Sequence, residues 1–221
     1  MSAPLTLALD AATYTGTVAI VAGDQVLAER ELAMRGEREE RLMPAVAEAL
    51  ALAGITVRDV ERVVCGAGPG SFTSLRIAGS IAKGIALGRS VPLYAVSSLL
   101  LIVAGGAQAP GRYLAVLDAM RGEAFAAGYE LLATGEIVDV GDATLGARDE
   151  VGELARRIGA QCIGPAEELV AIPRASGVAR LAMRLGCGGP VALASWEPAY
   201  GRAAEAQVKW ERAHGRPLPR V

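Results

Sequence analysis

Apolar and polar positions along the first half of the chain predict short strands, followed by alternating helices and strands. Three apolar segments with Gly or Asp between them predict a meander of strands at residues 5–9, 17–22 and 25–32. Apolar residues at helical spacing then predict a helix from about Glu37 to Ala53, ended by Gly54. Further strands are predicted at 62–65 and 91–96, with helices from about Phe72 to Leu87 and from Ser98. This half therefore has the order βββαβαβα.

The second half repeats this order in a weaker form. Residues 114–140 can be laid over residues 7–32, because each begins with an apolar strand ending in Asp-Ala and continues with a turn and two strands. A helix near 147–158, a strand at 161–163 and a helix near 176–185 follow. We expect an internal duplication, with an N-terminal lobe at residues 1–105 and a smaller, eroded C-terminal lobe at 106–221. Two tandem βββαβα-type lobes predict an α/β protein of the actin-like ATPase/sugar-kinase (ASKHA) superfold, which by itself does not define a function.

Composition and charge exclude several classes of protein. Hydrophobic residues make up 52% of the chain and charged residues 21%, which excludes a disordered chain and a coiled coil. The formal net charge of −2 provides no basic excess for holding a nucleic acid. Residues 90–111 carry no charge, but Pro92 and the polar residues among them favour a strand and a Ser-capped helix over a membrane span. No basic region precedes the first apolar stretch, so we expect no signal peptide and a cytoplasmic protein.

The rarest residue types limit the chemistry. His214 is the only histidine, which excludes a His-rich zinc site. Three cysteines, Cys65, Cys162 and Cys187, are odd in number and include no CxxC pair, which favours buried thiols in a reducing compartment. We therefore predict no metal ligands and no cofactor.

A Gly-rich loop lies between the strand that ends at Cys65 and the helix that begins near Phe72. Such a loop at a helix N-terminus can hold a phosphate through its backbone N–H groups. No lysine follows in the P-loop position, however, and the spacing matches neither Walker A nor the dinucleotide fingerprint. The favoured interpretation is a structural turn in which glycines adopt unusual dihedrals and Ser71 or Thr73 caps the helix. The residues assigned to this loop are Gly66, Gly68, Pro69, Gly70, Ser71 and Thr73.

The helix after this loop carries a stripe of small residues at helical spacing. Gly79, Ala82 and Ala86 form the stripe, and Gly84 and Gly88 lie on an adjoining one. We expect Ile77, Ile81 and Ile85 to pack on the sheet, so that the small residues remain free for close approach by another helix. The helix at 37–53 presents a similar set, namely Leu42, Ala45, Ala49 and Leu52. Together these faces favour a protein partner.

Asp10 and Asp118 occupy equivalent strand ends in the two repeats. In an actin-like enzyme such carboxylates handle magnesium and phosphate or act as the catalytic base. The alternative is an Asx turn that closes each strand end, which we favour.

Several segments in one order resemble the bacterial TsaB (YeaZ) family: ALDAATYTGTVAI, EERLMP, VVCGAGPGSFTSLRIAGSIAKGIALG, VPLYAVSSL, VLDAMRGEAFAA and EPAYGR. The resemblance implies an actin-like fold of two lobes and a non-catalytic subunit that forms a heterodimer with its catalytic paralogue TsaD, joined later by the ATPase TsaE. The complex forms threonylcarbamoyladenosine beside the anticodon of tRNAs that read codons beginning with A. The tRNA would be contacted mainly through the partner.

The resemblance also implies which residues dock on TsaD. Residues 40–44 and 72–87 match the two docking helices, which assigns partner contacts to Glu40, Leu42, Ala45, Ala49, Phe72, Leu75, Arg76, Gly79, Ala82, Lys83 and Ala86. The chain departs from the family pattern at Arg38-Glu39, where His-Ser is usual, at Ser74, where Gly is usual, and at Ala11, where Thr or Ser is usual. TsaD holds its metal through histidines on the corresponding helix, and this chain has none there, so no catalytic residue is assigned.

Three other hypotheses remain. An ATP-dependent kinase of the acetate- or sugar-kinase type would need a second Gly-rich loop, for which Gly186–Pro190 is the only candidate, and a helix ending in a glycine cap also explains that segment. A peptidase would have to recruit His214 as its base. A homodimer through the two-helix face is expected when the protein is isolated.

Overall fold

The first of two five-stranded sheets is built from the N-terminal half of the chain. The computed structural model describes residues 3–34, 40–201 and 214–215. The sheet has the order β3-β2-β1-β4-β5, with β1–β3 antiparallel and β4 and β5 parallel to β1. Its strands are β1 (Leu5–Asp10), β2 (Thr15–Ala22), β3 (Gln25–Ala33), β4 (Arg62–Gly66) and β5 (Leu93–Val96).

The second sheet repeats this topology. Its order, β8-β7-β6-β9-β10, is the first order with each strand number raised by five, and its strands pair in the same directions. Its strands are β6 (Gly111–Asp118), β7 (Glu123–Leu131), β8 (Ile137–Ala147), β9 (Gln161–Gly164) and β10 (Leu169–Val170). The predicted duplication and the two-lobed α/β fold class are therefore confirmed.

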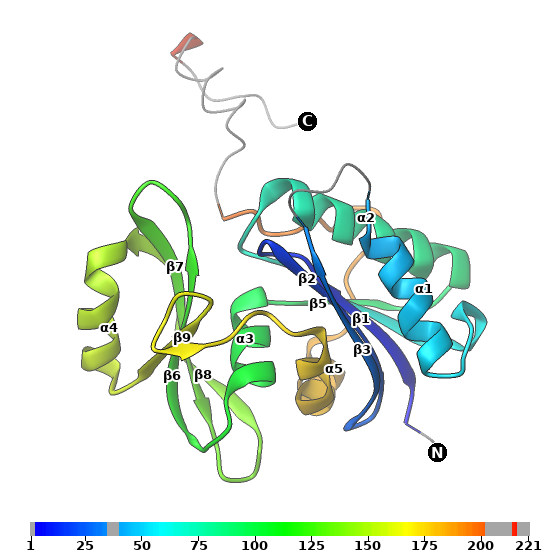
Figure 1. The fold of residues 1–221 in the computed structure, drawn as a ribbon, viewed down its shortest axis with the longest axis horizontal. Coiled ribbons are helices and arrows are strands. Elements are labelled where there is room, and N and C mark those ends of the chain that lie inside the picture. The colour runs from blue at the N-terminus through cyan, green and yellow to red at the C-terminus, as the bar shows by residue number, and fades with distance from the viewer. Residues whose placement is uncertain (1–2, 35–39, 202–213, 216–221) are drawn as a thin grey trace.

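Helices cover the outer faces of the two sheets unequally. On the first sheet, α1 (Leu42–Leu52) and α2 (Phe72–Arg89) lie side by side, whereas only the short α4 (Val151–Ile158) covers the second (Figure 1). The remaining helical segments are α3 (Ser98–Gly106), α5 (Ala182–Gly188) and the 3-10 segments η1 (Val57–Asp59), η2 (Arg148–Glu150) and η3 (Ala175–Leu181).

The inner faces of the two sheets share one core. Along β1, Leu7 and Leu9 pack toward α1 and α2, while Ala8 points to the opposite side, as the alternation of a strand requires. The inner residues of both sheets meet around α3, whose residues from Ser98 to Ala104 are all buried (Figure 1). The two repeats are therefore joined through α3.

Residues beyond the second sheet return to the first one. The Thr17 hydroxyl donates to the Pro173 carbonyl at 3.0 Å and accepts the Ala175 N–H at 3.0 Å. At the edge strand β3, Arg174 pairs with Glu29 at 3.4 Å. The domain division at residue 105 stays a prediction, and part of the predicted second lobe contacts both sheets.

Most predicted elements are confirmed with small shifts at their ends. Helix α1 begins at Leu42 rather than near Glu37, and residues 35–39 lie outside the described ones. Gly54 follows the last residues of α1 with a φ of 68°, as expected of a residue that ends a helix. The uncharged segment 90–111 forms β5 and α3, although the N-cap residue Ser97 makes no side-chain cap. Among the described residues, no helix is long and apolar enough to cross a membrane.

The shared core predicts that the two repeats unfold together. Ile102→Ala, which empties a fully buried position on α3, should lower the free energy of unfolding by about 3 kcal/mol. Urea unfolding followed by circular dichroism and by tryptophan fluorescence should still give coincident transitions. Met183→Ala, at a side chain that is 81% exposed, is the control and should change stability little. Two separate transitions in the wild type would contradict a common core.

Candidate docking surface and the glycine loop

A buried carboxylate ties three segments together at the carboxyl end of β1. Asp10 is fully buried, its Oδ1 accepts the Ala12 N–H at 2.8 Å, and its Oδ2 accepts the hydroxyl of Ser98 at the start of α3. Ser98 Oγ also accepts the Gly68 N–H at 3.1 Å, while the Ser98 N–H donates to the Gly68 carbonyl at 2.8 Å. The end of β1, the glycine loop and α3 are therefore held in one hydrogen-bonded cluster.

Burial raises the pKa of Asp10 from 3.8 to about 6, and the hydrogen bonds from Ser98 and from Ala12 only partly oppose this. No space remains around the carboxylate, since a Cβ on Gly66 would lie 1.8 Å from Asp10 Oδ2. Only glycine is tolerated at position 66. This carboxylate therefore acts as a structural group in the present conformation.

Asp118 makes the same turn as Asp10 but in an exposed position. Its Oδ1 accepts the Met120 N–H at 2.8 Å, two residues on, as Asp10 does with Ala12. The Asx-turn interpretation of both strand ends is therefore confirmed. The two turns are also in contact, since the hydroxyl oxygen of Tyr14 lies 4.0 Å from Sδ of Met120.

The glycine loop is filled by the chain itself. The N–H of Ala67 donates to the Val96 carbonyl at 2.7 Å, and the N–H of Ser71 donates to the Ala12 carbonyl at 2.8 Å. A Cβ on Gly68 would lie 2.5 Å from the Ala199 carbonyl oxygen, and one on Gly70 would lie 2.2 Å from that of Ala12. Since these N–H groups already have partners, the loop does not present them to a phosphate. The unusual glycine dihedrals expected for a structural turn are observed, with a φ of 87° at Gly68 and 159° at Gly70, and the structural role of the loop stays a prediction.

The predictions for the start of α2 and for the end of α5 have different outcomes. Of the two predicted cap residues, Ser71 and Thr73, Ser71 occupies the N-cap position of α2, but its hydroxyl pairs with that of Ser74 at 3.0 Å and makes no side-chain cap hydrogen bond. At the other proposed loop, α5 ends with Gly189 at its C-cap, with a φ of 69°. A glycine cap therefore accounts for residues 186–190, which provides no second phosphate loop for a kinase.

The stripe of small residues on α2 faces inward. Gly79, Ala82 and Ala86 are buried, whereas Ile77, Ile81 and Ile85 are only half-buried and pack at the edge of the same core. The prediction that the small residues remain free for a partner is therefore wrong. Small side chains are needed here because other parts of this chain approach α2 closely, as the contact of Gly79 with Pro198 shows.

Several other residues assigned to the partner are likewise in the core. These are Leu42, Ala45 and Ala49 on α1 and Leu75 on α2, each at most 6% exposed. They hold the two helices on the first sheet and cannot contact another protein in this conformation.

The outer face of the two helices is exposed and consists mainly of small and apolar residues. We call it the docking face and define it by exposed residues of α1 and α2: Met43, Ala47, Leu52, Thr73, Arg76, Ser80, Gly84 and Leu87. Leu87 is 72% exposed and Leu52 is 55% exposed, although both are large and apolar. A Cβ on Gly84 would have no neighbour within 4 Å. Such a face leaves room for the close approach of another helix.

Four of the residues that the resemblance assigns to partner contacts are at least partly exposed, and each makes a different contact within the chain. The Glu40 carboxylate accepts the N–H groups of Leu42 and Met43 and so caps α1. Phe72 is exposed at the start of α2, where the Arg76 guanidinium carbon lies 5.3 Å from its ring centroid. Lys83 is half-buried and donates to the Trp196 carbonyl at 2.9 Å. Arg76 thus contributes a positive charge to the docking face.

The docking face was missed in part because the largest aliphatic residues were expected to face the sheet. Ser80, Gly84 and Leu87 lie one helical step from the stripe chosen from the sequence. The pair Gly84 and Gly88 was a usable signal, because exposed glycines inside a helix weaken it unless close packing compensates.

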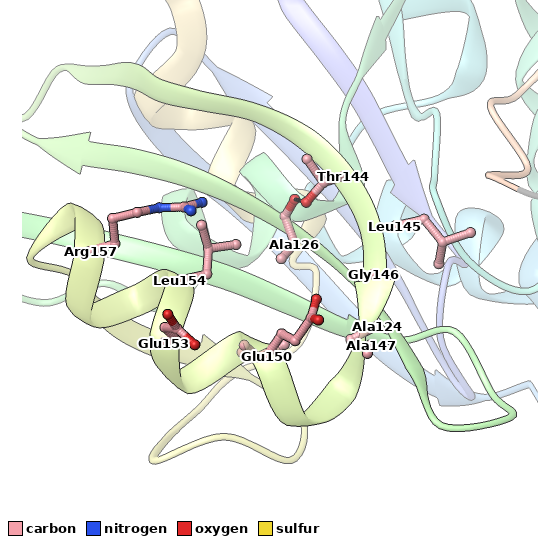
Figure 2. Close-up of a pocket in the computed structure, with 11 residues that line it drawn as sticks. Ala124, Ala126, Thr144, Leu145, Gly146, Ala147, Glu150, Glu153, Leu154 and Arg157 are labelled. Carbon is pink, nitrogen blue, oxygen red and sulfur yellow. Dashed lines mark hydrogen bonds between the residues drawn. The ribbon is translucent and has the colours of Figure 1, made fainter.

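A groove of about 450 Å³ lies on the outer face of the second sheet, remote from these residues. Its floor is made of Ala124, Ala126 and Gly146, and its rim carries Glu150, Glu153 and Arg157 from η2 and α4 (Figure 2). It is open because α4 is short and covers only part of this sheet. None of the residues predicted from the sequence lines it.

The described part of the chain contains no cluster of three His, Cys, Asp or Glu side chains able to hold a metal ion. Burial raises the pKa of the Cys65 thiol, and the nearby Asp10 adds to this. Cys65 is therefore an inert, buried thiol, as predicted. The same prediction is wrong for Cys187, which is exposed, and Cys162 is only half-buried.

Comparison of the sequence with protein families identifies a match over more than half of the chain. The model described as "TsaD: tRNA N6-adenosine threonylcarbamoyltransferase" matches residues 29–171. The TsaB protein of Escherichia coli is 39% identical over 126 residues, which cover 56% of this chain and 54% of that protein. The TsaB protein of Bacillus subtilis is 34% identical over 124 residues, with the same shares. The matched region thus spans about half the length of these curated relatives.

Comparison with solved structures supports the fold. A crystal structure from Pseudomonas aeruginosa, described as an uncharacterized protein with similarity to peptidase YEAZ, superposes with a TM-score of 0.77 at 24% identity. The alignment covers 90% of this chain and 100% of that one. A second structure, "YeaZ from Pseudomonas aeruginosa", gives a TM-score of 0.73 at 24% identity and covers 89% of this chain and 99% of that one. Both show the same two-lobed architecture.

The raised pKa of Asp10 predicts a specific pH dependence of stability. Asp10 is protonated in both states only well below pH 3.8. Between 3.8 and about 6, the pKa of the folded state, the folded protein holds the proton more tightly than the unfolded chain, and this stabilising contribution is lost as the pH rises through about 6. The whole shift corresponds to about 3 kcal/mol of unfolding free energy, most of which is lost between about pH 4 and pH 7. Asp10→Asn should remove this slope in urea titrations carried out across that range.

Asp118→Asn is the matched control, because it alters the equivalent turn at an exposed carboxylate. The same pH slope in the wild type and in Asp10→Asn would contradict the assignment to Asp10.

Proposed function

We propose that this chain, which belongs to the TsaB (YeaZ) family, acts in tRNA threonylcarbamoyladenosine biosynthesis as a non-catalytic subunit that docks on TsaD. The names of its relatives supply the pathway. Docking occurs through the outer face of α1 and α2, and the tRNA and the ATPase TsaE are engaged through the resulting complex.

The observation that carries the proposal is the docking face. Leu52 and Leu87 are exposed on neighbouring helices, and the other residues of the docking face are small or apolar except Arg76. The only carboxylate of α1, Glu48, pairs with Arg30 of β3 at 3.2 Å. Covering this face with a partner helix would therefore remove apolar surface from water and bury few charges.

TsaD is the favoured partner because its family model matches this chain. Two related chains with the same fold can place equivalent helix pairs against each other about a pseudo-two-fold axis. The same geometry allows a homodimer of this chain when TsaD is absent. The homodimer is then a competing use of one surface and not a separate function.

A non-catalytic role follows from the chemistry available in the sequence. A metal site built from several histidines is excluded, because the chain has only His214. In the loop that could have held a nucleotide phosphate, the N–H groups of Ala67, Gly68 and Ser71 are bonded to the chain itself. The kinase alternative therefore has no phosphate site to support it, and we assign catalysis to the partner.

Gly84→Arg tests the docking face. Gly84 is exposed with no neighbours, so the arginine should be accommodated while its charge and bulk obstruct a partner helix. We expect the affinity for TsaD of the same organism, measured by titration calorimetry, to fall about a hundredfold. Gly79→Arg is unsuitable because its side chain would enter the core.

Val170→Arg is the control, because this side chain is 78% exposed on β10, far from the docking face. It should leave the affinity unchanged. If Gly84→Arg binds TsaD as tightly as the wild type does, the partner uses another surface.

A further inference from the structure

A segment after α5 runs along the inner side of α2, the second of the two helices that form the docking face. We call residues 191–201 the strap. It begins beside β5, where the Val191 N–H donates to the Leu93 carbonyl at 2.8 Å. It ends at the glycine loop, where the Ala199 N–H donates to the Ala67 carbonyl at 2.7 Å (Figure 1, orange). The strap therefore runs from the edge strand β5 of the first sheet to the loop that precedes α2.

The buried stripe of small residues on α2 is the surface that receives the strap. A Cβ on Gly79 would lie 3.2 Å from Pro198 Cγ and 3.6 Å from the Trp196 ring. Val191, Leu193 and Trp196 pack on the same core as Ala82 and Ala86. At Gly79, the stripe that predicted a partner helix therefore contacts a segment of the same chain.

A polar contact beside this stripe and an aromatic contact at the start of α2 fix the strap on the helix. Lys83 donates from α2 to the Trp196 carbonyl at 2.9 Å. At the N-terminus of α2, the Tyr200 ring centroid lies 4.5 Å from that of Phe72. Beyond it, a Cβ on Gly201 would lie 2.5 Å from the ring of Phe125 on β7. The strap thus connects α2 to the second sheet as well.

We propose that the strap is a positioning element for docking, which holds α2 so that its outer face is presented in one fixed orientation. This proposal rests on the proposed function, since the surface that it orients is the docking face. Inner and outer faces belong to one helix, so any shift of the inner contacts moves Arg76, Ser80 and Gly84 together. A helix that is already fixed loses less conformational freedom on binding, which favours affinity. Gly79, Lys83, Trp196 and Pro198 are then positioning residues that do not touch the partner.

Gly79→Ala is the substitution that tests this role. The added methyl group meets Pro198 at a distance that forces the strap to move, and it is buried, so it cannot contact TsaD. Gly152→Ala is the matched control, because it makes the same change within α4, where a Cβ meets nothing within 4 Å. Both substitutions replace glycine by alanine and so favour the helix by about 1 kcal/mol. The change in helix propensity therefore does not distinguish the two variants.

Three measurements follow the strap, the helix and the docking separately. In a Trp210→Phe background, Trp196 is the only tryptophan, and its quenching by acrylamide should rise about twofold in Gly79→Ala as the ring becomes more exposed. Hydrogen exchange of the α2 amides should become about tenfold faster. The affinity for TsaD should fall about tenfold. Gly152→Ala should match the wild type in all three, and Lys83→Met should repeat the pattern of Gly79→Ala.

Each result decides the role of the strap. Increased quenching with unchanged affinity would overturn the proposal, because a displaced strap would then have no effect on docking. Reduced affinity with unchanged quenching and exchange would also overturn it. If the wild type itself does not bind TsaD, the proposed function fails. Exchange in α2 then still tests the strap: faster exchange in Gly79→Ala alone supports its hold on the helix, and unchanged exchange overturns it.

Discussion

Close packing on the inner side of α2 is the constraint on which the rest of the structure depends. Glycine and alanine at positions 79, 82 and 86 allow the strap and the first sheet to approach this helix at van der Waals distance. Larger side chains there would push the helix outward and separate the strap from the glycine loop. The outer side, with Ser80, Gly84 and Leu87, is then left uncovered on a helix whose position is fixed. Intramolecular packing and partner recognition are thus two sides of one element.

The two repeats have diverged at the places that matter for this arrangement. In the first repeat, the 18-residue α2 connects β4 to β5, whereas in the second only residues 165–168 separate β9 from β10. The second sheet therefore has no counterpart of α2, and a groove remains beside α4. Asp10 and Asp118 diverge in the same way, since they make equivalent turns but only Asp10 is sealed between a glycine loop and α3. Partner recognition is accordingly assigned to the first repeat.

Much of this fold could be predicted from the sequence because its periodicities are strong and its turns are marked by glycine. The strand order of each sheet follows from the repeat, and the segment without charges is correctly divided into β5 and α3. The orientation of α2 could not be predicted. Its isoleucines and its small residues lie on adjacent faces, and the choice between them depends on residues 191–199, more than a hundred positions later in the chain. Local hydrophobicity holds no information about such a contact.

The site was predictable only in outline for the same reason. The sequence identifies the two helices and the loop before them, but burial decides which of their residues are available to a partner. Leu42, Ala45 and Leu75 belong to the core, while Arg76 and Phe72 are exposed at its edge. Family resemblance transfers the segment that docks more reliably than it transfers individual contacts. The side chains on a helix that face outward are set by everything packed beneath it.

The most direct test of the central claim is an omission experiment. Threonylcarbamoylation of tRNA would be reconstituted from the TsaD and TsaE proteins of the same organism with the enzyme that makes the activated carbamoyl donor, ATP, threonine, bicarbonate and tRNA, with and without this chain. The modified nucleoside would be quantified by mass spectrometry. Our account predicts that modification requires this chain, although the chain has no activity alone. Modification that proceeds equally well without it would contradict the account.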